Sequence, residues 1–226
     1  MIEFELPGGR AAFSTRRGGV SEGPFESLNL GRLVGDEPGH VAENRARLAA
    51  ATVPQASGLQ VHGTAIAEWE VLPPPGEDPT EADGHMTAAP GLGLLVLVAD
   101  CLPVALIAPG RAAMLHCGWR PLAGGLIEKA LALFEEAPAA AIGPGIGPCC
   151  YEVGEEVLAE FSDLDGVAEG RMLDLKAVAR RKLEAAGVER IDDTGLCTSC
   201  NPEEFFSHRR DHGVTGRQGG VAWLSE

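Results

Sequence analysis

The stretch GLLVLVADCLPVALIAPGRAAMLHCGWR, residues 93–120, decides the fold of this chain. It contains apolar runs with the length of buried strands, at 93–99, 103–108 and 112–116. Turn residues separate these runs, and Asp100 stands at the first break. The stretch therefore predicts neighbouring buried strands that are joined at a functional turn.

The same apolar stretch is long enough to be considered as a membrane span. Asp100 lies at its centre with Pro103 close behind, and both residues are costly in lipid. The segment Met1–Leu6 alternates in hydropathy and carries acid, so it lacks the basic and apolar regions of a signal peptide. We therefore expect no membrane partner and a cytoplasmic location.

Further elements flank the central strands. We expect a hairpin over 1–14, loops at 15–32 and 73–79, a helix over 36–51, strands at 60–62 and 64–72, a helix from Pro121 to about Glu136, a strand at 139–142, helices at 154–162 and 172–186, and a closing strand at 220–224. Strands follow one another in hairpins and also follow helices, which favours mixed β-sheets in an α+β fold. With 226 residues, the whole chain 1–226 is expected to form a single domain.

Acidic residues dominate the charge of the chain. The sequence has 18 Lys and Arg against 33 Asp and Glu, a net charge of −15. Such a charge opposes binding to nucleic acid and to anionic membranes. A small anionic ligand remains compatible with it, because local arginines or backbone amides can override the overall field at one pocket.

Two histidines and a cysteine lie at the ends of apolar, strand-like runs. These are His62, Cys101 and His116. Imidazole and thiolate are the ligands that zinc prefers, and three protein ligands leave a fourth position for water or substrate. The residues alone also allow a simpler interpretation, in which the histidines are hydrogen-bonded core residues and Cys101 is a small buried hydrophobe.

The chain holds six cysteines without an export signal, which favours reduced thiols over a disulfide framework. Cys197 and Cys200 have C-x-x-C spacing, but one such pair cannot close a tetrahedral zinc site. A second zinc would require Cys149 and Cys150 to join them. We expect all four to be ordinary packed thiols.

Several motifs follow one another in the order seen in the YfiH-type family, whose members are labelled both polyphenol oxidase (laccase) and purine nucleoside phosphorylase. The motifs are Thr15–Ser21, Ser27–Gly31, Asn44-Arg45, Gln60–Gly63, Ala99–Cys101, Leu115–Arg120, Gly143–Gly154, Cys197-Thr198, Phe205–Ser207 and Thr215–Gln218. Together they cover nearly the whole chain. The chain is identified as resembling this family.

The resemblance implies a fold, a cofactor and a reaction. The fold is a four-layer α/β/β/α sandwich, and His62, Cys101 and His116 match the zinc ligands. The implied substrates are a purine nucleoside and phosphate: adenosine, inosine or methylthioadenosine is phosphorolysed, and adenosine is also deaminated. Deamination needs a zinc-activated water at the purine C6, with Asp83 or Asp100 moving protons.

Phosphorolysis also needs a site for the phosphate anion. We assign Arg45 and Arg120 to phosphate, because guanidinium groups match its oxygens bidentately. Asn29 is assigned to ribose or base. His85 departs from the family pattern; we expect it at the surface, and a place in the pocket is the alternative. The protein is expected to be a monomer or a weak oligomer.

Three other functions remain open. A copper-dependent polyphenol oxidase could use the same ligands with Met86 or Met114 as an axial ligand, although six histidines are too few for the copper set of a laccase. A metal-free cysteine hydrolase could use Cys101 as nucleophile and His116 as base. A non-catalytic binding module would leave the placed histidines and cysteine without a purpose.

Overall fold

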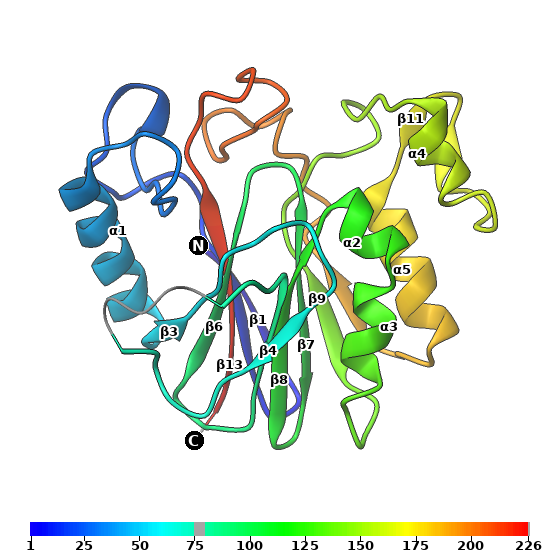
Figure 1. Cartoon of the computed structure of the whole chain (residues 1–226), viewed down its shortest axis with the longest axis horizontal. Helices are drawn as coiled ribbons and strands as arrows, with labels where there is room; N and C mark the ends of the chain where they lie inside the picture. Colours follow the sequence, from blue (N-terminus) through cyan, green and yellow to red (C-terminus); the bar gives the residue numbers. More distant parts are fainter. Residues whose placement is uncertain (75–79, 226) are drawn as a thin grey trace.

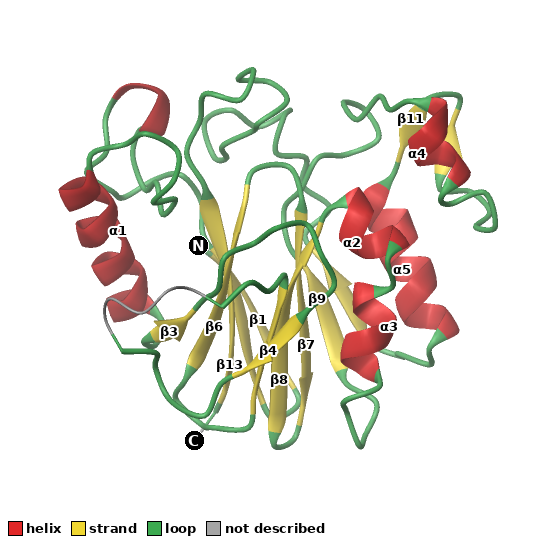
Figure 2. Cartoon of the chain, viewed as in Figure 1, coloured by secondary structure: helices red, strands yellow, loops and turns green. Residues whose placement is uncertain are grey.

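The computed structural model describes residues 1–74 and 80–225 and has the four layers α/β/β/α (Figures 1 and 2). One sheet contains β1 (Ile2–Leu6), β2 (Gly9–Phe13), β13 (Gln218–Leu224), β6 (Gly93–Val98) and β3 (Gln55–Ala56), in that order. The other contains β12 (Ile191–Asp193), β9 (Ala139–Ile142), β7 (Leu102–Ala108), β8 (Arg111–Cys117), β5 (Gly84–Thr87) and β4 (Ile66–Glu68). A small third sheet pairs β10 (Ala168–Glu169) with β11 (Met172–Leu173).

Both large sheets are mixed, as the sequence predicts. Strands β1, β2, β13 and β6 pair antiparallel, and β3 adds to β6 in parallel. In the second sheet β9, β7, β8 and β5 pair antiparallel, whereas β12 and β4 join the two edges in parallel. The predicted α+β class and the four-layer arrangement are confirmed.

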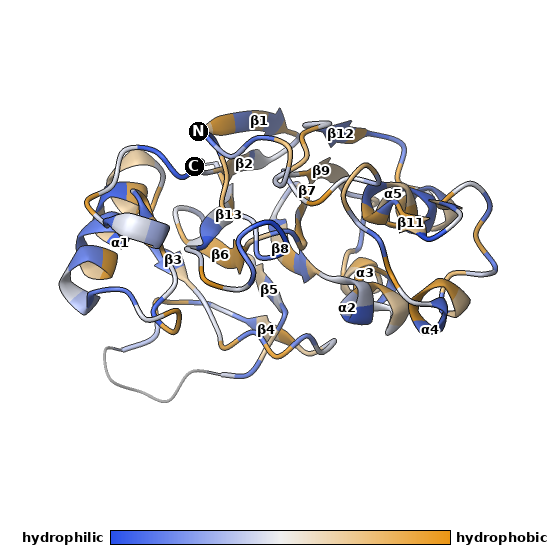
Figure 3. Cartoon of the chain, turned by 90° about the horizontal axis from the view of Figure 1, so that it is seen from above, coloured by the Kyte–Doolittle hydropathy of each residue, from blue (hydrophilic) through white to orange (hydrophobic). Residues whose placement is uncertain are grey.

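Helices cover the outer faces of the two sheets. Helix α1 (Pro38–Ala51) packs on the first sheet, and α2 (Trp119–Ala123), α3 (Leu126–Leu131) and α5 (Leu175–Ala185) pack on the second (Figure 3). The two remaining helical segments are a 3-10 turn at Gly23–Phe25 and α4 (Glu155–Ala159). Apolar side chains fill each of the three spaces between layers, so most of the free energy of folding comes from burial of these faces.

Some expected elements differ in the structure. The helix expected from Pro121 to about Glu136 is two short helices, because Gly124 and Gly125 lie between them and Gly125 has a φ of 81°. Only Ile66–Glu68 is a strand within the expected runs 60–62 and 64–72. Most of the predicted loop 73–79 lies outside the described residues. No helix in the described part of the chain is both long and apolar enough to cross a membrane.

Several loops that follow or join the central strands gather at one end of the two sheets. The β6–β7 turn, the end of β8 and the loop after β9 all lie at the upper end in Figure 1. The end of β12, which pairs in parallel with β9, points the same way. Side chains from distant parts of the sequence therefore meet at this end.

Candidate metal centre

His62, Cys101 and His116 converge at this end of the sheets. His62 lies in the loop before β4, Cys101 in the turn between β6 and β7, and His116 near the end of β8. Their ligand atoms all lie within 4.8 Å of one another. Cys101 Sγ is 3.9 Å from His62 Nε2, and the two imidazole rings are 4.8 Å apart between centroids. His116 is buried, Cys101 is half-buried and His62 is exposed, so the cluster opens to solvent on one side.

Asp83 holds two of these residues in place from behind. Its carboxylate is fully buried and lies 2.7 Å from His116 Nδ1. The backbone amides of Val61, His62 and Gly63 all donate to the same carboxylate, at 2.7 to 3.1 Å. Asp83 therefore fixes the His62 loop and directs Nε2 of His116 toward the cluster, an arrangement that is typical of metal-binding histidines.

The backbone is strained at the cluster. His62 has a φ of 58° and Asp100, just before Cys101, has a φ of 91°. Residues other than glycine adopt this region at a cost of about 1–3 kcal/mol each, and such residues collect at functional sites. The hydrogen bonds to Asp83 offset this cost at His62.

Cys101 and His116 shift each other's pKa toward the thiolate and imidazolium forms. Burial opposes ionisation of the Cys101 thiol, but the charge and hydrogen bonds of His116 and His62 outweigh it and lower its pKa to about 6. Burial likewise opposes the imidazolium form of His116, but the Cys101 thiolate and Asp83 raise its pKa to about 9. A thiolate is the form of cysteine that binds metal and attacks carbon.

Asp100 is held by the loop that precedes β13. Thr198 Oγ1 donates to one carboxylate oxygen at 2.6 Å, and the Arg209 backbone amide donates to the other at 2.7 Å. The Asp100 carbonyl also accepts from the Ile146 amide at 2.8 Å. Three segments thus fix the turn that carries Cys101.

A cavity of about 370 Å³ lies next to the turn, on the side of α2 and α4. Its lining includes Trp119, Tyr151 and Arg209, but none of the three clustered ligands. Burial, followed by the charge of Cys101, raises the pKa of Tyr151 to about 12, so its hydroxyl stays protonated. Arg209 lies over the Tyr151 ring at 5.1 Å. These two residues are missing from the sequence-based site, and the position of Tyr151 within the Gly143–Gly154 motif is the signal that could have found it.

The two arginines assigned to phosphate come from opposite outer layers. Arg45 lies on α1, where Nε donates to the Leu30 carbonyl at 2.9 Å; burial and the charge of Arg32 lower its pKa to about 10. It forms no ion pair with any described residue. Arg120 lies on α2, with its guanidinium 4.3 Å from the Trp119 ring centroid. No contact between the two is found, so they do not form one clamp.

Asn29 is fully occupied within its own loop. Its amide nitrogen donates to the Gly31 carbonyl and to Asp36, and its amide oxygen accepts from the backbone amides of Gly31 and Arg217. The side chain is completely buried. The structure gives Asn29 a positioning role, and direct substrate binding remains a prediction that requires one of these bonds to break.

Three further residues that the sequence analysis considered have other surroundings: His85, Met86 and Met114. His85 is fully buried between the Trp69 indole and the Gly58 amide, so the expected surface position is wrong. Its strand, β5, pairs on both sides and buries every residue. Met86 contacts the Arg111 guanidinium, and Met114 packs between the two large sheets. Neither of these contacts involves His62, Cys101 or His116.

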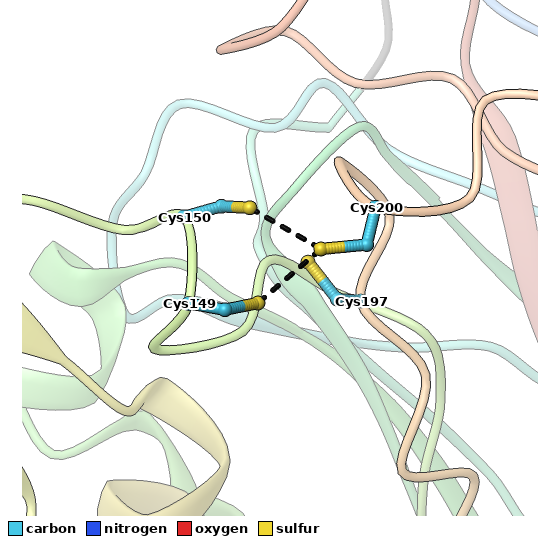
Figure 4. A group of neighbouring side chains, drawn as sticks. All are labelled: Cys149, Cys150, Cys197 and Cys200. Carbon is cyan, nitrogen blue, oxygen red and sulfur yellow. Dashed lines mark hydrogen bonds between the residues drawn. The ribbon is translucent and has the colours of Figure 1, made fainter.

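The four cysteines for which the sequence predicts ordinary packed thiols also gather. Cys149, Cys150, Cys197 and Cys200 have sulfurs that all lie within 4.8 Å of one another, and Figure 4 shows them pointing inward from two loops. Cys149 and Cys200 are exposed. We call this group the tetracysteine cluster.

Known proteins resemble this chain over nearly its full length. The model of a family described as multi-copper polyphenol oxidoreductase laccase matches residues 10–225. Purine nucleoside phosphorylase YfiH of Escherichia coli strain K12 is 40% identical over 98% of this chain and 97% of its own. A purine nucleoside phosphorylase of Deinococcus radiodurans is also 40% identical, over 94% of this chain and 88% of its own.

Solved structures of related proteins have the same fold as this chain. YlmD from Geobacillus stearothermophilus superposes with a TM-score of 0.88 at 35% identity, covering 97% of this chain and 93% of its own. YfiH from Bacillus licheniformis gives 0.85 at 32% identity, covering 96% and 92%. Both the sequence family and the four-layer structure are thus shared, and the chain belongs to the YfiH-type, laccase-like family.

Proposed function

We propose that this protein is a zinc-dependent purine nucleoside enzyme that phosphorolyses adenosine, inosine or methylthioadenosine and deaminates adenosine. The observation that carries the proposal is the convergence of His62, Cys101 and His116, with Asp83 orienting His116 from behind. Relatives named purine nucleoside phosphorylase, at 40% identity, support the substrate class.

The donor set fits zinc. Two imidazoles and one thiolate are common ligands of catalytic zinc, and the exposed side leaves a fourth position open. Ordinary zinc bond lengths place a nitrogen and a sulfur ligand about 3.6 Å apart. The 3.9 Å separation of Cys101 Sγ and His62 Nε2 is close to this value. When bound, zinc would supply a Lewis acid at the open side of the cluster.

The chain's own residues bind and orient the substrate. Trp119 and Tyr151 offer aromatic faces beside the cavity, which suit a purine ring. Of the two carboxylates assigned to proton transfer, Asp83 already accepts four hydrogen bonds, whereas each Asp100 oxygen accepts one. We therefore assign proton movement to Asp100 and positioning of the ligands to Asp83.

Phosphate is assigned to Arg120 and Arg45, each acting alone. Arg120 lies close enough to the cavity for its charge to affect the pKa of Tyr151. Arg45 is a half-buried cation without an acidic partner among the described residues, which favours an anion as its ligand. We further propose that the protein works in a reducing cytoplasm, since all six cysteines are free. We also propose that it is a monomer or weak oligomer.

A second candidate is the metal-free cysteine hydrolase. Cys101, His116 and Asp83 stand in line as nucleophile, base and orienting acid, with the thiolate already favoured. Copper oxidation is less well supported, because Met86 and Met114 lie elsewhere. The exposed His62, which such a hydrolase would not need, favours the metal-dependent function.

Elemental analysis and a nucleoside panel test the proposal together. The protein is expressed without added metal and assayed on adenosine, inosine and methylthioadenosine, with and without phosphate. His62→Ala should remove zinc from the centre and abolish turnover, whereas the matched control His40→Ala on α1 should keep both. Full turnover in a His62→Ala protein that holds one zinc fewer than the wild type would favour the cysteine hydrolase instead.

A further inference from the structure

We propose that the tetracysteine cluster is a second metal site, which binds one structural zinc ion and ties together the two loops that support the Cys101 turn. The cluster shares no residue with the candidate catalytic centre. The inference does not depend on the proposed function.

The sulfur positions suit a single ion. A zinc ion with four thiolate ligands has sulfurs about 3.8 Å apart, given zinc–sulfur bonds of about 2.3 Å. Cys200 Sγ lies 3.3 Å from Cys149 Sγ and 3.4 Å from Cys150 Sγ, and all four sulfurs fall within 4.8 Å. Such a compact set leaves room for one ion and not for a cluster with two irons. Four thiolates in tetrahedral positions are typical of structural zinc.

The backbone around the cluster is arranged as in thiolate metal sites. The Gly147 amide donates to Cys197 Sγ at 3.2 Å, and the Asn201 side chain holds the Cys197 carbonyl at 2.8 Å. A hydrogen bond to sulfur stabilises a thiolate ligand. Exposed Cys149 and Cys200 give an ion a path from solvent.

The pairing of strands explains why these loops meet. Strands β9 and β12 are parallel neighbours, so their C-terminal ends lie at the same edge of the sheet. The loop after β9 carries Cys149 and Cys150, and the loop after β12 carries Cys197 and Cys200. A further bridge between Gly145 and Cys197 extends the parallel pairing up to the cluster.

Each of the two loops that carry the cluster contacts Asp100 in the catalytic turn. Thr198, within the C-x-x-C segment, is fully buried and donates to Asp100 at 2.6 Å. Ile146, in the other loop, donates its amide to the Asp100 carbonyl. An ion held by both loops would thus fix two of the three contacts of Asp100, next to Cys101.

Zinc counting on the full chain by native mass spectrometry and elemental analysis tests this proposal. The wild-type protein should hold two zincs, and Cys101→Ser should keep one. The double variant Cys149→Ser/Cys200→Ser should lose the second zinc and unfold at a temperature lower by several degrees. The control Cys117→Ala, which removes a buried thiol outside the cluster, should keep both ions.

A conservative variant keeps the test decisive if the double variant does not fold. Cys149→His replaces an exposed ligand with another zinc ligand and should retain two zincs, whereas Cys149→Ser should lose one. Cobalt bound to Cys101→Ser should show the intense charge-transfer absorption of four thiolates. A Cys101→Ser protein without metal, iron in place of zinc, or a disulfide between Cys200 and Cys149 or Cys150 in freshly purified protein would each overturn the proposal.

Discussion

The protein has two clusters that contain cysteine, and their surroundings differ. At the candidate catalytic centre, Cys101 lies beside two histidines, and the buried Asp83 carboxylate contacts His116. The backbone is left-handed at His62 and at Asp100, the residue before Cys101. At the tetracysteine cluster, four sulfurs come from two loops and leave no ligand position open. The first arrangement keeps a position for substrate, and the second closes every position, which is the usual distinction between catalytic and structural zinc.

Removing the single thiolate of the catalytic centre should have the largest effect. We expect Cys101→Ser to lose the metal of that centre and at least about a thousandfold in kcat, because a Lewis acid contributes several kcal/mol to the transition state. The thermal midpoint should change little. Elemental analysis, turnover and calorimetry on the same sample check this, and a variant that retains both metal and turnover would show that the site is misplaced.

Changing the carboxylate behind His116 should have the next largest effect. Asp83→Asn keeps the shape of the side chain but removes its charge. We expect metal affinity to fall about 10- to 100-fold, which a competition titration with a chelator measures. Unchanged affinity would mean that Asp83 only orders the loop 61–63. Among the described residues no carboxylate contacts the tetracysteine cluster, so the metal affinity of that cluster should remain as in the wild type.

The assigned arginines separate the two reactions. Arg120→Ala and Arg45→Ala should each raise the KM for phosphate by about tenfold, because each removes a charge-assisted hydrogen bond. Deamination of adenosine, which uses no phosphate, should change less. Steady-state kinetics on both reactions decide the point, and equal losses would assign these arginines to the nucleoside or to the fold.

The bond that joins the two regions should give the smallest effect. Thr198→Val leaves the Asp100 carboxylate with one partner fewer and should cost about 1–3 kcal/mol of stability. The variant should still hold two zincs per chain, while its thermal midpoint falls by a few degrees. Ser199→Ala, one residue along the same segment, is the control and should leave the midpoint unchanged. A lost zinc in Thr198→Val would mean that the bond itself shapes the cluster.

The sequence predicts the centre of the fold better than its edges. The runs around 93–117 are continuous and apolar, as expected of strands buried on both faces, and they became β6, β7 and β8. The expected helix from Pro121 failed because the Gly124-Gly125 pair separates two short helices. Burial of His85 was missed because its strand, β5, was not predicted.

The two metal centres also differ in how far the sequence could predict them. Each residue of the candidate catalytic centre lies at the end of an apolar run or beside a turn. The meeting of the three residues therefore follows from strand ends that lie at the same end of the sheets. The second depends on β9 pairing with β12, whose sequence Ile191–Asp193 is mostly acidic and has no strand pattern. Without that pairing, Cys150 and Cys200, 50 residues apart, gave no sign of proximity.

X-ray absorption at the zinc edge of the wild-type protein tests the two-centre account most directly. One thiolate at the catalytic centre and four at the tetracysteine cluster predict an average of about two and a half sulfurs per zinc, at about 2.3 Å, with two zincs per chain. An average of one sulfur with a single zinc would contradict the structural site. An average of four with a single zinc would contradict the catalytic one.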